Sequence, residues 1–220
     1  ATRDWSFTIT QGLGVSFSNV TVSVSDFQGN DVIYAGTGND FVYAGGGGDE
    51  VYGGEGNDTV IGEGGDDFIE GGAGNDFLEG DASWVALSDQ GNDYIDGGSG
   101  DDRIWGGAGS DDLFGGADND EIYGDNGDAG DGDDYLDGEG GNDTLYGYGG
   151  NDTIFGGAGS DHIDGDNGQA GAGDDYIDGE GDDDTIYGGA GSDQIYGGAG
   201  NDYIAGDYLV AGDDYIDGGS

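Results

Sequence analysis

The feature that most constrains this chain is an aspartate that returns every nine residues from Asp31 onward. Two residues after each of these aspartates stands Ile, Leu or Val, as in Asp31 with Ile33. The unit occurs 19 times, and its aspartates are Asp31, Asp40, Asp49, Asp58, Asp67, Asp76, Asp93, Asp102, Asp111, Asp120, Asp134, Asp143, Asp152, Asp161, Asp175, Asp184, Asp193, Asp202 and Asp214. A short fixed period of this kind indicates a repeat architecture, in which each unit stacks on its neighbours.

The composition of one unit predicts its local structure. Six positions are rich in Gly, Asn and Asp, as in GGAGND at 71–76, and they favour a turn because glycine tolerates left-handed backbone conformations. The other three positions allow only a very short strand, whose central aliphatic side chain points to one side and whose two neighbours point to the other. Two units then make one coil, and successive coils stack in parallel about 4.8 Å apart. We therefore expect an all-β fold with the aliphatic residues of two sheets facing each other.

The best copies of the unit match a known pattern. GGAGNDFLE at 71–79 and GGAGNDYIA at 197–205 fit the nonapeptide G-G-x-G-x-D-x-U-x, in which U is a large aliphatic residue. From Asp31 to its end the chain resembles the RTX, or hemolysin-type calcium-binding, family of secreted bacterial proteins. The resemblance implies a right-handed parallel β-roll (β-solenoid) of about 19 units, a secreted or cell-surface location, and export by a type I secretion channel.

The acidic composition argues that this fold needs a cation. The chain has 50 Asp and Glu residues against two Arg and no Lys, a formal charge of about −48, which excludes direct binding to nucleic acid or to an anionic membrane. Stacked coils place aspartate over aspartate, and the only regular core is one aliphatic residue per nine. Without counter-ions the folded state should therefore be less stable than the unfolded state. With no Cys and one His, thiolate or imidazole metal sites are excluded.

We expect Ca²⁺ to be the stabilising cation. Turns 18 residues apart would bring two of the repeating aspartates around a shared gap, and turn carbonyls would complete an all-oxygen shell, which suits Ca²⁺ better than Mg²⁺. If units n and n+2 share each ion, the 19 units hold at most about 17 ions, which leaves a net charge of about −14. Extracellular calcium modules bind with Kd values of about 10⁻⁴ to 10⁻³ M, so we expect the chain to be unfolded at cytosolic calcium and folded outside the cell.

Four gaps in the period predict inserts at one edge of the roll. They lie near 81–90, 125–131, 166–172 and 207–211 and add 8, 5, 5 and 3 residues, always after an even-numbered unit. Each opens with Gly followed by Asp, and the four aspartates are Asp81, Asp125, Asp166 and Asp207. Two interpretations remain open: these aspartates cap a widened turn, or they supply additional calcium ligands. Other substitutions that weaken particular sites are Asp118 and Asp182 at the inner turn glycine and Glu63 and Glu139 at the second one.

The outward positions carry aromatic residues. Odd-numbered units display Tyr52, Phe68, Tyr94, Phe114, Tyr135, Phe155, Tyr176, Tyr196 and Tyr215, mostly with an acidic residue at the other outward position. Such a row can bind a glycan or a protein, or it can serve only as a set of good β-formers that cover a thin core. The 18-residue spacing of Arg103 and Glu121 predicts an ion pair between coils.

The chain divides into two parts of different composition. Residues 1–27 alternate apolar and polar residues and contain few acids, so they predict a strand-rich cap or the tail of a preceding domain. Residues 28–220 form the predicted roll, and we expect both parts to belong to a larger secreted or surface protein.

No catalytic constellation stands out, so we expect a non-enzymatic calcium-binding segment whose parent protein, a toxin, adhesin, protease or lipase, can carry a separate catalytic domain. The alternative function is an adhesin or polysaccharide-binding module that uses the aromatic face.

Overall fold

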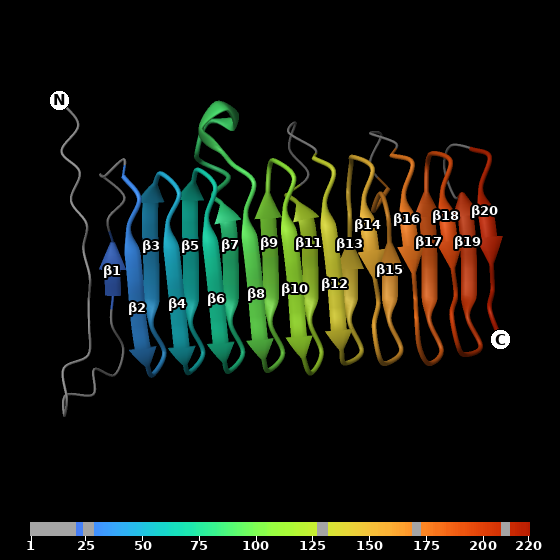
Figure 1. Ribbon diagram of the computed structural model, residues 1–220, viewed down its shortest axis with the longest axis horizontal. Helices are drawn as coiled ribbons and strands as arrows, with labels where there is room; N and C mark the ends of the chain where they lie inside the picture. Colours follow the sequence, from blue (N-terminus) through green and yellow to red (C-terminus); the bar gives the residue numbers. More distant parts are fainter. Residues whose placement is uncertain (1–20, 24–28, 127–131, 169–172, 208–211) are drawn as a thin grey trace.

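The computed structural model describes residues 21–23, 29–126, 132–168, 173–207 and 212–220. In these ranges the chain forms a roll of two parallel sheets with ten strands each (Figure 1). Consecutive strands alternate between the sheets, so that odd-numbered strands make one sheet and even-numbered strands the other. The predicted all-β parallel β-roll is confirmed, with one strand, β2 to β20, for each of the 19 units.

The odd sheet contains β1 (Thr21–Ser23), β3 (Phe41–Gly46), β5 (Thr59–Gly64), β7 (Phe77–Asp81), β9 (Arg103–Gly107), β11 (Glu121–Asp125), β13 (Thr144–Tyr146), β15 (His162–Asp164), β17 (Thr185–Gly189) and β19 (Tyr203–Asp207). The even sheet contains β2 (Val32–Thr37), β4 (Glu50–Glu55), β6 (Phe68–Ala73), β8 (Tyr94–Ser99), β10 (Asp112–Ala117), β12 (Tyr135–Gly140), β14 (Thr153–Phe155), β16 (Tyr176–Asp178), β18 (Gln194–Tyr196) and β20 (Tyr215–Asp217). A single 3₁₀ turn, η1 (Leu87–Asp89), lies in the first insert, and no helix of the described ranges is long and apolar enough to cross a membrane.

The register between coils follows the spacing of the repeat. In uninterrupted stretches the partners are 18 residues apart, as with Ile33 and Val51. Across the first insert the offset grows to 26, as with Ile69 and Ile95, so the insert is accommodated without a shift of the aliphatic residue to the other face. This first insert lies at one edge of the roll (Figure 1). The others follow β11, β15 and β19 of the same sheet, but residues 127–131, 169–172 and 208–211 lie outside the described ranges.

Strand length corrects one expectation. The repeat predicts strands of about three residues, yet β2 to β6 have six residues each, because their ladders continue into the glycines of the following turn. Gly36, for example, is in register with Gly54 one coil on. Glycine permits this continuation with a positive φ, 110° at Gly36 and 109° at Gly54. The later strands β13 to β16 have the three residues expected.

The core is the predicted double row of aliphatic residues. Ile33, Val42, Val51, Val60, Ile69, Leu78, Ile95, Ile104, Leu113, Ile122, Leu136, Leu145, Ile154, Ile163, Ile177, Ile186 and Ile195 are buried in one continuous cluster, against which Ile204 packs. Only the last coil is less covered, and Ile216 remains 47% exposed. At the other end β1 extends the odd sheet, with Val22 in register with Val42. The other strands expected in residues 1–27 lie outside the described residues.

Candidate metal sites

The 19 repeating aspartates stand at the two edges of the roll, each directly before a strand. One edge, which we name the regular edge, has no insert, and its aspartates precede the odd strands: Asp40, Asp58, Asp76, Asp102, Asp120, Asp143, Asp161, Asp184 and Asp202. The other, the interrupted edge, contains the four inserts, and its aspartates precede the even strands: Asp31, Asp49, Asp67, Asp93, Asp111, Asp134, Asp152, Asp175, Asp193 and Asp214. Seventeen of the 19 are no more than 3% exposed, and Asp202 and Asp214 in the last coils are half-buried.

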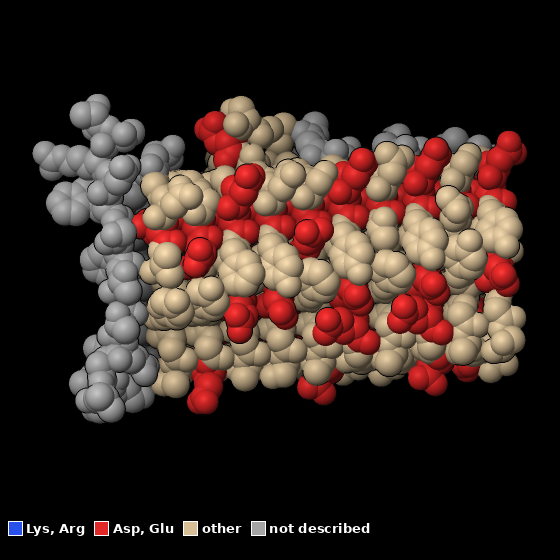
Figure 2. Space-filling model, in the orientation of Figure 1, with Lys and Arg blue, Asp and Glu red and all other residues tan. Residues whose placement is uncertain are grey.

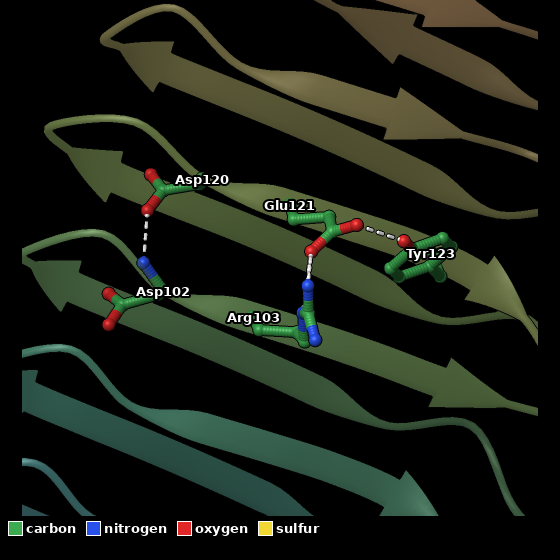
Figure 3. Close-up of polar contacts among 5 residues, drawn as sticks. All are labelled: Asp102, Arg103, Asp120, Glu121 and Tyr123. Atoms are coloured by element: carbon green, nitrogen blue, oxygen red, sulfur yellow. Dashed lines mark hydrogen bonds and ion pairs between the residues drawn. The ribbon is translucent and has the colours of Figure 1, made fainter.

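A hydrogen-bond ladder joins the aspartates along each edge. The backbone N–H of one aspartate donates to the carboxylate Oδ1 of the aspartate one coil further on, for example Asp102 to Asp120 at 2.7 Å (Figure 3). The same bond crosses the first insert, from Asp67 to Asp93 at 2.8 Å, although 26 residues separate the two. The turns thus hold each carboxylate in a fixed orientation toward the preceding coil.

The second carboxylate oxygen of most of these aspartates is buried and has no hydrogen-bond donor. This holds for Oδ2 of Asp49, Asp58, Asp67, Asp76, Asp93, Asp102, Asp111, Asp120, Asp134, Asp143, Asp161, Asp175, Asp184, Asp193 and Asp202. At Gly138 an added Cβ would lie 2.6 Å from Oδ2 of Asp143 and 2.5 Å from the carbonyl oxygen of Gly156. Both oxygens therefore converge on the first glycine of the turn, where a side chain would block the space between them.

Buried oxygens without donors fit a hard cation. A buried carboxylate is costly unless it is paired, and a carboxylate beside a backbone carbonyl is the type of ligand set that Ca²⁺ takes in proteins. The described ranges contain no cluster of three or more His, Cys, Asp or Glu side chains that could hold a metal. A cation here would therefore depend on backbone carbonyls as well as on aspartate, as the sequence predicts.

Burial shifts the acidity of the aspartates strongly. It raises the pKa of Asp49 to about 6 and that of Asp143 to about 7, and neighbouring aspartates add to the increase. Next to the inserts the increase is larger: the pKa of Asp134 rises to about 9, first through burial and then through the charge of Asp111, and that of Asp175 also rises to about 9, mainly through burial. At neutral pH, the carboxylates of Asp134 and Asp175 therefore retain protons unless a cation compensates their charge.

Three of the four insert aspartates, Asp81, Asp166 and Asp207, close their loops by accepting backbone hydrogen bonds. Oδ2 of Asp81 accepts the N–H of Gly91 at 3.0 Å, and both carboxylate oxygens of Asp207 accept that of Gly212 at 3.0 Å. Asp166 accepts the N–H of Gly173 at 3.4 Å and also that of Ala190 one coil on. These bonds support the interpretation that they cap a widened turn. A ligand role stays a prediction, and Asp81 offers a buried Oδ1 with no hydrogen bond for it.

Substitutions at turn glycines keep the left-handed backbone. Glu63, Asp118, Glu139 and Asp182 replace glycines and retain φ values of 83°, 80°, 61° and 74°. Tyr148 and Glu180, with φ values of 79° and 64°, occupy second-glycine positions in the same way. They are not among the predicted substitutions, although the same alignment of units reveals them. Each such residue costs about 1 kcal/mol or more relative to glycine.

Comparison with known proteins agrees with this geometry. The model of the RTX calcium-binding nonapeptide repeat, written as four copies, matches residues 27–60, 52–83, 88–122, 105–128, 128–163, 164–195 and 181–207. A search of curated proteins gives no match.

Proposed function

The chain belongs to the family of RTX calcium-binding nonapeptide repeats, and from this premise we propose that Ca²⁺ held between successive coils drives the roll to fold. The observation that carries the proposal is the double ladder of buried aspartates, in which, from Asp49 onward, one carboxylate oxygen is bonded to the coil before and in most the other is left without a donor. A calcium-binding β-roll of this kind is a structural segment and not a catalytic one.

The 19 repeating aspartates named above are the proposed side-chain ligands. In this proposal each ion lies between two aspartates one coil apart, with carbonyl oxygens such as those of Gly156 and Gly71 as further ligands. Ca²⁺ would supply the positive charge that two buried carboxylates lack. The ladder of each edge sets the upper limit of about 17 ions, because 19 aspartates in two columns make 17 consecutive pairs.

The same geometry accounts for a folding switch. Without a cation the buried carboxylates keep protons or repel one another, and both states cost free energy. Ligand sets that bind with millimolar affinity are empty at cytosolic calcium and filled outside the cell, so the chain would pass a type I secretion channel unfolded and fold after export. RTX repeats occur in secreted bacterial proteins, and an extracellular or cell-surface location follows from this proposal.

The test is a titration of the calcium-free chain with Ca²⁺, followed by far-UV circular dichroism at physiological ionic strength. We expect a cooperative coil-to-β transition near millimolar Ca²⁺, reversed by a chelator and not reproduced by Mg²⁺. A matched experiment by isothermal titration counts the ions bound. If the calcium-free chain in chelator already shows the full β signal, the folding switch is refuted. If Mg²⁺ produces the same transition at the same concentration as Ca²⁺, the selectivity for calcium is refuted.

A further inference from the structure

The even sheet carries an unbroken row of aromatic rings along the whole roll. We name this row the even-strand ladder, and its members are Tyr34, Tyr52, Phe68, Tyr94, Phe114, Tyr135, Phe155, Tyr176, Tyr196 and Tyr215. Consecutive rings lie 4.8 to 5.8 Å apart between centroids, so each ring contacts the next one along the roll. The rings cover one another in part, yet Tyr94 remains 36% exposed and Tyr215 54% exposed.

Carboxylates and rings alternate on this face, both along each strand and from one strand to the next. Asp112 of β10 stands in register with Tyr94 of β8, and Phe114 of β10 with Asp96 of β8. The next strand reverses the order again, because Asp112 is also in register with Tyr135. Ring-bearing residues form a band along the face drawn in Figure 2, with acidic side chains on both sides and no described basic side chain in view. Each ring between β8 and β12 therefore has a carboxylate beside it.

The carboxylates of this face are close enough to influence the rings. After burial, the charges of Asp96, Glu139 and Asp112 raise the pKa of the Tyr94 phenol. The hydroxyl of Tyr135 donates to Oδ2 of Asp137 at 3.2 Å. The chain cannot neutralise these groups itself, because its basic residues are two arginines and one histidine against 50 acidic residues.

The odd sheet shows how a cation fits such a surface. Figure 3 shows Arg103 of β9 paired with Glu121 of β11, whose other oxygen accepts the hydroxyl of Tyr123. The predicted ion pair between coils is thereby confirmed. The guanidinium carbon also lies 5.5 Å from the ring centroid of Trp105, within the range of a cation–π contact. One guanidinium thus uses a ring of one coil and a carboxylate of the next.

We propose that the even-strand ladder is a docking face for an extended, arginine-containing segment of another protein. It repeats, without a basic residue of its own, the ring-plus-carboxylate arrangement that holds Arg103 on the odd sheet. Arginine fits better than lysine because its planar guanidinium stacks on a ring and still donates to a carboxylate. This face is separate from the aspartate ladders at the edges, so the inference does not depend on which ions fill the turns.

The test compares two peptides on the full chain at saturating Ca²⁺ and physiological ionic strength. One peptide alternates Arg with Ser, the other alternates Lys with Ser, and their Kd values are measured by fluorescence anisotropy. Diffuse attraction to a polyanion would give the two peptides the same Kd, whereas docking on the aromatic rings would give the Arg peptide the lower Kd. We expect the Arg peptide to bind about tenfold more tightly than the Lys peptide.

Variants locate the binding to the ladder. The triple variant Tyr94→Leu, Tyr135→Leu, Tyr176→Leu keeps every charge, and we expect it to bind the Arg peptide about tenfold more weakly. The control variant Tyr146→Leu, Tyr203→Leu changes rings of the odd sheet, and we expect no change in Kd. Circular dichroism in Ca²⁺ verifies that both fold, and if the triple variant does not, Asp96→Asn with Asp137→Asn weakens binding while keeping all rings.

Three results would overturn the inference. The first is equal affinity for the Arg and Lys peptides, which would leave only diffuse charge. The second is an equal loss of binding in the ladder and control variants. The third is ring-dependent binding of a neutral oligosaccharide together with ring-independent binding of the Arg peptide, which would assign the ladder to glycans.

Discussion

The two edges of the roll carry the same aspartate ladder but raise the pKa values of its carboxylates to different degrees. At the regular edge the resolved pKa values of the repeating aspartates range from about 6 at Asp76 to about 8 at Asp120. At the interrupted edge they reach about 9 at Asp134 and Asp175, the two aspartates that follow the second and third inserts. The second and third inserts are thus associated with a larger increase in the pKa of the carboxylate that follows them.

Burial is the main cause of these raised pKa values, and a second carboxylate in the interrupted turn adds to it. Asp81 is fully buried in the turn of Asp93, and its charge is among those that raise the pKa of Asp93. In the next interrupted turn Asp125 acts in the same way on Asp134. An insert therefore makes the cation-free roll more costly at its own turn, and the requirement for a counter-ion is strongest at the interrupted edge.

The largest expected effect is a pH-driven transition of the calcium-free chain. The pKa values of most of the buried repeating aspartates are raised above the unfolded value of about 3.9, so the contribution of these groups to stability is complete below that pH. It is lost as the pH rises through about 6 to 8 at the regular edge and about 9 at Asp134 and Asp175. We expect acidification without calcium to increase the β signal in circular dichroism. A β signal that falls on acidification from pH 8 to pH 5 would contradict this sign.

A side chain at the first turn glycine should block a metal site at either edge. Gly138→Ala at the regular edge places a Cβ 2.5 Å from the carbonyl oxygen of Gly156, and Gly106→Ala at the interrupted edge would overlap Asp111 and the carbonyl of Gly124. We expect each variant to lose one bound ion in isothermal titration and about 1–3 kcal/mol of stability in Ca²⁺.

The matched control lies in the same turn as Gly138. Gly140→Ala would have Gly116 O at 3.8 Å as its nearest neighbour, and Gly140 does not have a positive φ. We expect it to change stability by less than about 0.5 kcal/mol and to leave the ion count unchanged. Equal losses in Gly138→Ala and Gly140→Ala would show that the oxygens at the first glycine hold no ion.

Asparagine at one aspartate of each edge tests the comparison directly. In Ca²⁺, Asp134→Asn and Asp143→Asn each remove a charged ligand and should cost about 1–3 kcal/mol. Without calcium at pH 8 the order changes: Asp134→Asn should stabilise the roll more than Asp143→Asn, because burial raises the pKa of Asp134 to about 9 and that of Asp143 to about 7. Chemical denaturation in both conditions measures the change in the free energy of unfolding. Identical changes for the two variants would show that the two edges do not differ in their need for a counter-ion.

The smallest expected effect concerns the sheet face between the edges. The side chains of Arg103 and Glu121 are 53% and 32% exposed, so solvent screens their ion pair. We expect Arg103→Ala to cost no more than about 1 kcal/mol at saturating Ca²⁺, measured by thermal unfolding, and Glu121→Gln to cost a similar amount. A loss above about 2 kcal/mol would mean that the face stabilises the roll as strongly as an edge site does.

Much of the candidate site was predictable from the sequence because it depends on spacing alone. Asp67 and Asp93 are 26 residues apart, and the eight-residue insert between them accounts for the difference from 18. The length of β2 was not predictable in this way, because it depends on whether the turn glycines continue the backbone ladder of the coil beside them. Tyr148 was overlooked because a bulky residue at a left-handed position contradicts the local preference of the chain.

The period of the sequence by itself determined the unit, the inward aliphatic residue and the coil offset, since side-chain direction in a strand has a period of two residues. Only the tertiary structure decided which oxygen of each aspartate is satisfied. In Asp120, Oδ1 accepts the N–H of Asp102 and Oδ2 remains buried without a donor. The physical reason is that a hydrogen bond depends on the distance and angle between two coils, and these exist only once the coils have stacked.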